Sequence, residues 1–405
     1  MTCTRPLPTK HRSRTLTLIL ASALLMALGT PEALLASEPV FTGQAIIHNG
    51  SGAFINPWSI SKSNDRDFYV TGAVNQDGWA VKTDTKGDIL WRYDLREGTA
   101  GLIRPDGAFI YAAVPAHNHE TYLCASSRAQ LAMLVRLDSR GHELSRKVLS
   151  PDRQDRGAGR YVSLGANCMQ WGRNFVYVGD EQFYERYGSP RSGHDRFYWV
   201  MVFDQDGRIE KQWQIPVGVR WAARVTAYIN GHNLFFSKTD NTNTDLVQIN
   251  LDTSAVSKKE ISGSAFAVQS PRTFFLFSFL QRPKVRLLRF RNDILSFDNN
   301  LRDQTDVAAA PRDFSGVEAY GWRDGSYILF GYHLHVKHSL PTMGIAVLAR
   351  AHAEHLMDFP SAAPSANAGR NQVVDVTRGY GHRTFAILRR VFGVDGVVID
   401  FVAIK

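Results

Sequence analysis

Arginine, tyrosine and histidine side chains gather in two stretches of the chain that carry no strand pattern, residues 150–160 and 181–196. The candidate binding residues in these stretches are Arg153, Arg156, Arg160, Tyr184, Tyr187, Arg191 and His194. Tyrosine offers a large, nearly rigid surface and arginine a planar fork of donors, and both are enriched at binding hot spots. Three interpretations stay open at this point: a binding surface, a catalytic site, or an ordinary solvated loop.

Motifs that prepare a nucleophile or a catalytic metal are missing from the sequence, since neither Gly-x-Ser-x-Gly nor His-Glu-x-x-His occurs. Glu181 and Glu185 are a carboxylate pair with acid–base capacity. His333 and His335 would point to the same side of a strand and, with His338, have the chemistry of a zinc or copper site. Exposed histidines at a strand end explain that spacing equally well. The sequence therefore predicts no catalytic residue, no metal site and no cofactor.

One local pattern recurs along the chain: an apolar stretch, an Asp, two further residues and a Gly. It occupies residues 79–87, 133–141 and 199–207, where the turn residues are Asp84, Asp138 and Asp204. The Asp side chain opens such a turn, and Gly takes the positive φ that a tight hairpin needs. Recurrence of one hairpin at intervals of tens of residues predicts repeated all-β units.

Strand-like segments from residue 54 onward fall into groups of four. The second group is assigned to residues 98–104, 108–114, 131–137 and 143–149, and the fifth ends with residues 294–297. The seventh has three strands, 373–377, 383–390 and 397–404, while residues 40–48 are left over at the other end. Completing the last group with that segment removes two exposed edges. We therefore expect an all-β propeller of seven four-stranded blades, closed by the N-terminal strand in the last blade. Six or eight blades stay open, because the fifth and sixth groups lack the Asp-x-x-Gly pattern.

The first group, residues 79–95, resembles the repeat of the quinoprotein-like and WD40-like β-propeller superfamily. The resemblance lies in a strand that ends in Asp-x-x-Gly and an outer strand that begins Gly87-Asp88-Ile89-Leu90-Trp91. It implies the propeller fold. Quinoprotein dehydrogenases are expected to have adjacent cysteines, and this sequence has none, so no quinone is implied.

The N-terminal 37 residues have the order of a secretory signal peptide: basic residues, an apolar run over 16–28, and small residues at Ala33, Ala36 and Ser37. The run is too short for a membrane-spanning helix, which needs about 20 apolar residues. We therefore expect a leader over 1–37, a single propeller domain over 38–405, a periplasmic or secreted location and no membrane span.

Charge narrows the class of partner. The leader accounts for +3 of the net charge of +9, which leaves about +6 on the mature chain. No run of five or six like charges occurs, so nucleic acid is not expected as a partner. An acidic protein or an anionic envelope polymer fits a mildly basic exported protein.

Two cysteines remain beyond the leader, Cys124 and Cys168. An even pair in an oxidising compartment is a disulfide candidate. The pairing stays open, since the strand map places the two cysteines near opposite ends of neighbouring sheets.

Three long connections, residues 115–130, 150–160 and 181–196, are expected to open on one face of adjacent blades. We interpret the chain as a monomeric binding module for a protein or an envelope polymer at that face. The alternative is a propeller enzyme of lactonase or lyase type, with polar groups from several blades around the central channel. The Tyr and Arg residues lie on loops away from the axis, which favours binding over catalysis.

Overall fold

The computed structural model describes residues 39–48, 55–75, 77–95, 108–126, 132–149, 160–184, 196–218, 225–239, 243–262, 264–267, 273–278, 284–289, 303–307, 314–321, 327–333, 342–349, 352–358, 372–381, 383–390 and 396–404. The expected leader, residues 1–37, lies outside these ranges. No helix in the described ranges is long and apolar enough to span a membrane.

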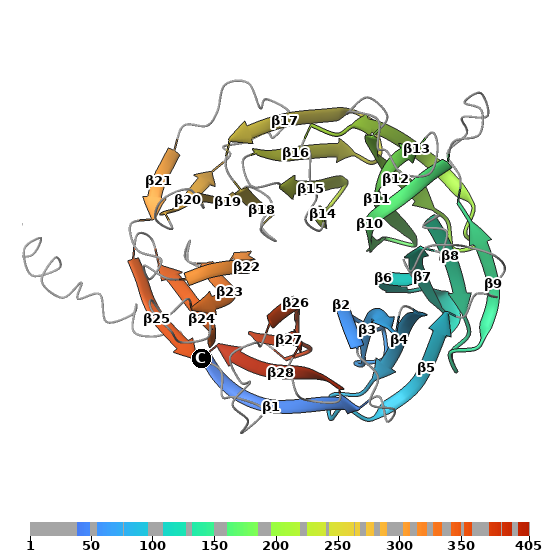
Figure 1. The fold of residues 1–405 in the computed structure, drawn as a ribbon, viewed down its shortest axis with the longest axis horizontal. Helices are drawn as coiled ribbons and strands as arrows, with labels where there is room; N and C mark the ends of the chain where they lie inside the picture. The colour runs from blue at the N-terminus through green and yellow to red at the C-terminus, as the bar shows by residue number, and fades with distance from the viewer. Residues whose placement is uncertain are drawn as a thin grey trace, which may run out of the picture. The chain divides into compact units, whose positions relative to one another are not determined.

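The strands group into seven four-stranded antiparallel sheets (Figure 1). The first three along the chain are β2 (Ile55–Lys62), β3 (Phe68–Val74), β4 (Asp77–Thr83) and β5 (Ile89–Leu95); β6 (Phe109–Pro115), β7 (Thr121–Ser126), β8 (Ala132–Leu137) and β9 (Glu143–Val148); and β10 (Arg160–Trp171), β11 (Asn174–Tyr184), β12 (Arg196–Phe203) and β13 (Ile209–Pro216).

The fourth to sixth sheets are β14 (Thr226–Asn230), β15 (Asn233–Thr239), β16 (Asn243–Asn250) and β17 (Val256–Ser262); β18 (Ser264–Ala267), β19 (Thr273–Ser278), β20 (Lys284–Arg289) and β21 (Asp303–Val307); and β22 (Phe314–Gly321), β23 (Tyr327–His333), β24 (Thr342–Ala349) and β25 (His352–Asp358). The last sheet has the order β26 (Gln372–Arg378), β27 (Thr384–Arg390), β28 (Gly396–Ile404) and β1 (Pro39–His48).

The sheets contact one another in cyclic order. The innermost strand β6 contacts β3 and β10, β10 contacts β14, and the series continues through β18 and β22 to β26, which contacts β2. The first and last sheets are therefore neighbours, as expected for a ring of blades. The prediction of an all-β propeller is confirmed.

Ring closure uses the N-terminal strand. β1 runs antiparallel to β28 from Pro39 opposite Ile404 to His48 opposite Gly396, with one irregularity near Gly43. Inside the strand pair, Gln44 donates a hydrogen bond from Nε2 to Asp400 Oδ1 at 2.8 Å. The predicted use of residues 40–48 as the outer strand of the last blade is confirmed.

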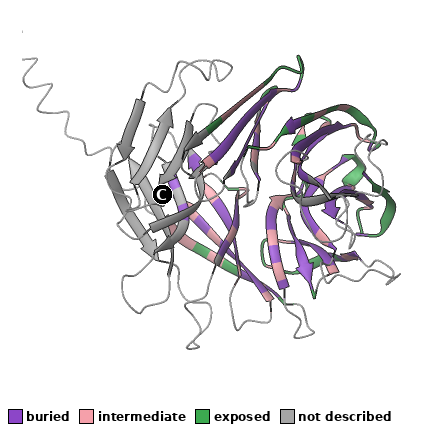
Figure 2. Cartoon of the chain, turned by 45° about the horizontal axis from the view of Figure 1, so that its top comes forward, coloured by how far each residue is buried: buried purple, intermediate pink, exposed green. Residues whose placement is uncertain are grey.

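The hydrophobic core consists of layers between neighbouring sheets rather than one central mass. Successive side chains of a strand point to opposite faces, so Phe175 and Tyr177 of β11 pack toward β6–β9, while Val176 and Val178 pack toward β14–β17. Figure 2 shows the resulting gradient from buried middle strands to exposed turns and outer strands. β12 is almost wholly buried, whereas every residue of β9 is exposed.

The recurring turn has the same geometry in all three copies. In the first copy, Asp84 Oδ1 accepts the backbone N–H groups of Lys86 and Asp88 at 2.8 and 2.9 Å, and Gly87 has a φ of 95°. Asp138 and Asp204 accept the equivalent pairs, with Gly141 and Gly207 at φ values of 84° and 74°. The turn role predicted for Asp and Gly is confirmed.

The strand map of the second blade is wrong. Residues 109–115 form the innermost strand β6 rather than the second strand, and residues 121–126 form β7 inside the expected loop 115–130. The segment 98–104 lies outside the described residues. These residues were assigned to a loop because β7 is short and begins and ends in polar residues. All six of its residues are nevertheless buried.

The fourth strand of the fifth sheet is also displaced. β21 (Asp303–Val307) pairs with β20, with Val285 opposite Val307. Residues 294–297, to which that strand was assigned, lie outside the described ranges.

Candidate functional site

Two of the predicted binding residues lie next to each other in the third sheet. Arg160 begins β10, Tyr184 ends β11, and the two are register partners. Both strands extend further than the sequence pattern predicted, which moves these residues from loops to strand ends. Arg153, Arg156, Tyr187, Arg191 and His194 lie outside the described residues.

The end of the β10–β11 pair belongs to one particular face of the propeller. In an up-and-down sheet, the second-to-third connections and the crossings between sheets leave on one face, and the other two turns leave on the opposite face. The start of β10, the end of β11 and the start of β12 therefore lie on the same face, which we call the crossing face. The remaining turns define the turn face.

The connection of the second blade lies on the turn face. It joins β6 to β7 through a 3-10 turn, η2 (His117–His119), and is therefore a first-to-second connection. The prediction that three long connections share one face is wrong for this one. Its histidines instead link neighbouring blades, since His119 Nδ1 lies 2.9 Å from Asp65 Oδ1 and the His117 N–H donates to Gln205.

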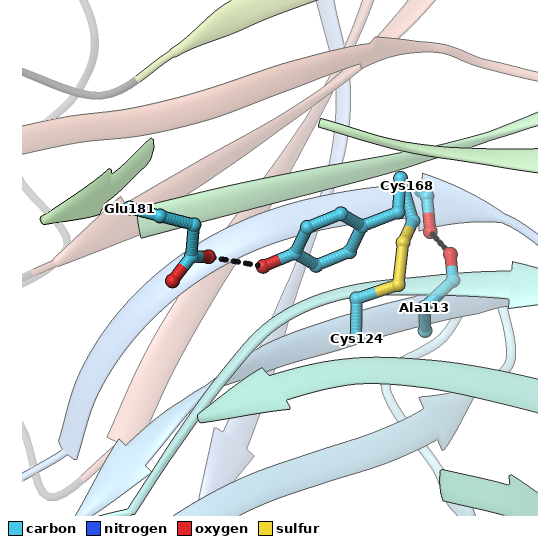
Figure 3. Close-up of a disulfide and its surroundings, with 6 residues drawn as sticks. Ala113, Cys124, Cys168 and Glu181 are labelled. Carbon is cyan, nitrogen blue, oxygen red and sulfur yellow. Dashed lines mark hydrogen bonds between the residues drawn. A yellow bond between two sulfur atoms is a disulfide. The ribbon is translucent and has the colours of Figure 1, made fainter. Parts of the chain in front are cut away.

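A disulfide ties the third sheet to the second (Figure 3). It joins Cys124 of β7 to Cys168 of β10, with 6.3 Å between the Cα atoms. Both cysteines are buried in the layer of apolar side chains between the two sheets. The predicted pairing is confirmed, and it fixes β10, the strand that begins with Arg160.

Glu181 is buried in the same layer. Tyr177 donates a hydrogen bond from its hydroxyl to Glu181 Oε1 at 3.1 Å (Figure 3), and only 1% of Glu181 is exposed. Burial raises the pKa of the neighbouring Tyr111 to about 12, and the Glu181 charge contributes to that rise. Glu181 is thus a buried hydrogen-bond acceptor, and Glu185, the other carboxylate of the suggested pair, lies outside the described residues.

Asp180, the preceding residue of β11, faces the other way, toward the fourth sheet. Arg196 of β12 donates two hydrogen bonds to the Asp180 carboxylate, from Nε to Oδ1 at 2.9 Å and from Nη2 to Oδ2 at 2.5 Å. Lys238 of β15 forms an ion pair with the same carboxylate from across the seam. Asp180 is fully buried and Lys238 nearly so. Burial lowers the pKa of Lys238 well below its ordinary value, because it disfavours the charged form.

A second carboxylate, Asp245 of β16, extends this group. Tyr198 donates its hydroxyl to Asp245 Oδ2 at 2.8 Å, and the Gly218 N–H donates to the same oxygen at 2.6 Å. Lys258 Nζ lies 3.3 Å from Asp245 Oδ1. Burial, followed by the Asp245 charge, raises the pKa of Tyr198 far above its usual range. We call Asp180, Arg196, Tyr198, Lys238, Asp245 and Lys258 the seam cluster.

The seam cluster lies toward the crossing face. Asp180 and Lys238 stand near the ends of second strands, while Arg196 and Asp245 stand near the starts of third strands. Gly218 follows β13, where the chain leaves for the crossing to the fourth sheet. The cluster therefore links the strand ends of the third and fourth sheets near the crossing face.

Sequence reasoning missed the seam cluster as a unit. The available signal was a charge at the end of an otherwise apolar strand: Asp180 after Phe175 to Gly179, and Lys238 after Leu234 to Ser237. Pairing these charges was out of reach, since residues 180, 196, 238 and 245 come from two sheets and share no local pattern.

Metal chemistry has no support in the described part of the chain, where no group of three or more His, Cys, Asp or Glu side chains is placed to hold an ion. His333 ends β23, whereas His335 and His338 lie outside the described ranges. The described geometry instead places Arg196, Lys238 and Lys258 around the two buried carboxylates Asp180 and Asp245.

Neither a protein-family model nor a curated protein matches the chain. The fold is similar to solved structures at low sequence identity. BBS1N, solved in complex with ARL6DN, matches with a TM-score of 0.50 and 10% identity over 92% of this chain and 98% of that chain. A chain of the mitotic checkpoint complex matches with a TM-score of 0.50 and 11% identity over 99% of both chains. The propeller of Dos1 matches with a TM-score of 0.49 and 9% identity over 87% and 78%. The likenesses to BBS1N and to the checkpoint-complex chain show the propeller fold alone.

Proposed function

We propose that this chain is an exported, monomeric β-propeller that binds a protein partner through the crossing face of its third sheet. The register of β10 and β11 is the observation that carries the proposal, because it brings Arg160 and Tyr184 to adjacent positions at that face. The five other candidate residues lie within ten residues of these strand ends in the sequence. Arg and Tyr residues gathered around one pair of strand ends have the composition of a binding hot spot.

Export is supported by two independent features. The first 37 residues have the order of a signal peptide. The disulfide between Cys124 and Cys168 belongs to an oxidising compartment. We therefore propose that the mature protein acts in the periplasm or outside the cell.

The fold relatives support a protein partner over a polymer. BBS1N was solved in complex with ARL6DN, and the second relative belongs to the mitotic checkpoint complex. An anionic envelope polymer remains the second candidate, on the strength of the mature chain's net charge of about +6.

The test is capture from envelope extract by immobilised mature protein, residues 38–405. Tyr184→Ala and Arg160→Ala should each weaken retention of the captured partner by about 30-fold if the residue is a hot spot of about 2 kcal/mol. The matched control is Arg140→Ala in the exposed turn after β8, on the turn face, and it should leave retention unchanged.

Retention that is equal in wild type and both crossing-face variants would contradict the proposal. Loss of a measured lactonase or lyase activity on changing a polar residue of the innermost strands would instead support the enzyme alternative. If the captured material survives protease treatment of the extract but disappears when envelope polysaccharide is digested, the partner is the polymer.

A further inference from the structure

The seam cluster is costly to bury and therefore calls for an explanation. Val176 and Val178 of β11 and Val200 and Val202 of β12, which face the same seam, are apolar and buried. Burying paired charges in place of apolar side chains rarely adds stability, because desolvation offsets the attraction. Its best-supported use is to select one geometry over others.

The geometry that the cluster selects is that of the strand ends at the crossing face. Asp180 lies four residues before Tyr184 on β11, and Arg196, which grips it, begins β12 opposite Gln182. Tyr184 in turn is the register partner of Arg160. Lys238 reaches Asp180 from the fourth sheet, so the position of these strand ends depends on the neighbouring blade.

We propose that Asp180 and Lys238 are positioning residues, which hold the ends of β10 and β11 so that Arg160 and Tyr184 can bind the partner. The inference rests on the proposed binding function. Neither residue touches the partner, since both are buried beneath the face. Their contribution is to lock the third sheet against the fourth at the level of the binding residues.

The closing sheet offers a matched control. Arg389 and Asp400 form an ion pair there that is as deeply buried as that of Asp180 and Lys238, with Arg389 Nη2 donating to Asp400 Oδ1 at 3.0 Å. Asp400→Asn removes the acid from a buried pair, as Asp180→Asn does, but far along the chain from β10 and β11. A general loss of stability should appear in both variants.

The first measurement is amide hydrogen exchange on the mature protein. Asp180→Asn should speed exchange at residues 160–162 and 182–184 about tenfold or more beyond the change in Asp400→Asn. Adding Lys238→Met to Asp180→Asn should partly restore slow exchange, because it removes a buried amino group that has lost the Asp180 carboxylate. Equal exchange at these amides in Asp180→Asn and Asp400→Asn would overturn the proposal.

Lys238→Met alone provides a second variant should Asp180→Asn fail to fold. It leaves Asp180 paired with Arg196 and releases only the tie to the fourth sheet, so exchange at residues 182–184 should still rise above the Asp400→Asn level. Unchanged exchange there would equally overturn the proposal.

The second measurement is retention of the partner captured from envelope extract. Asp180→Asn should weaken retention about as much as Tyr184→Ala does, with Asp400→Asn unchanged. Loss of retention in Tyr184→Ala but not in Asp180→Asn would overturn the positioning role alone. Unchanged retention in Tyr184→Ala would refute the binding function, whatever the exchange results.

Discussion

At the scale of single residues, the Asp-x-x-Gly turn combines a local and a long-range role. The aspartate carboxylate accepts two backbone N–H groups within its own turn. The glycine lies against the preceding sheet, since a Cβ on Gly141 would approach the Trp91 ring to 2.9 Å. The same four residues therefore shape a hairpin and allow it to pack on its neighbour.

Gly141→Ala should lower the free energy of unfolding by about 2–4 kcal/mol, because it combines a left-handed backbone conformation with a clash against Trp91. Gly172→Ala is the control. Gly172 also has a positive φ, 60°, but has no atom within 4 Å of the added Cβ, so only the backbone cost of about 1 kcal/mol applies. Urea unfolding of both variants measures the difference, and equal losses would show that the contact with Trp91 has no energetic weight.

Glu143 of the outer strand β9 makes the stability of the fold depend on pH. Hydrogen bonds from Arg146 lower the pKa of Glu143 below its ordinary value, and Tyr93 of the neighbouring sheet also donates to it. A lowered carboxylate pKa stabilises the fold above the unfolded-state pKa, and this contribution is lost as pH falls through the folded-state pKa.

Glu143→Gln should therefore flatten the acid limb of the stability curve below about pH 4.5. The effect should stay under about 1 kcal/mol because the carboxylate is partly exposed. Thermal melts between pH 6 and pH 3 measure the effect. If stability falls with pH equally in wild type and in Glu143→Gln, protonation of Glu143 does not contribute to the acid limb.

At the scale of strands and sheets, the turns could be predicted from local sequence, whereas a short buried strand and a buried charge cluster could not. Asp84 and Gly87 specify their turn through their own backbone and side chain, so the hairpin could be read directly. β7 was missed, because a short buried strand that is polar at both ends resembles a loop. The seam cluster had no local signature, because Asp180 and Lys238 meet only after two sheets have packed.

The disulfide is the covalent tie between the second and third sheets, and its removal should be costly. For a sequence separation of 44 residues, the chain-entropy model gives a stabilisation of about 4 kcal/mol. The double variant Cys124→Ala, Cys168→Ala should shift the urea midpoint accordingly. An unchanged midpoint would contradict the structural role.

At the scale of the whole molecule, counting strands predicted how the ring closes. A last group with three strands and a spare segment at the N-terminus left one arrangement without open edges, and β1 pairs with β28 in that way. Function did not follow from the fold in the same manner, since propellers are a scaffold for many activities. The proposal therefore depends on which face carries the binding residues.

The most direct test of that claim is a hydrogen-exchange footprint of the partner on the mature protein. We expect protection at residues 160–162 and 182–184, on the crossing face of the third sheet, and no protection in the turns at residues 84–88 and 138–142. Protection confined to those turns, or to the innermost strands β2, β6 and β26 around the axis, would contradict it.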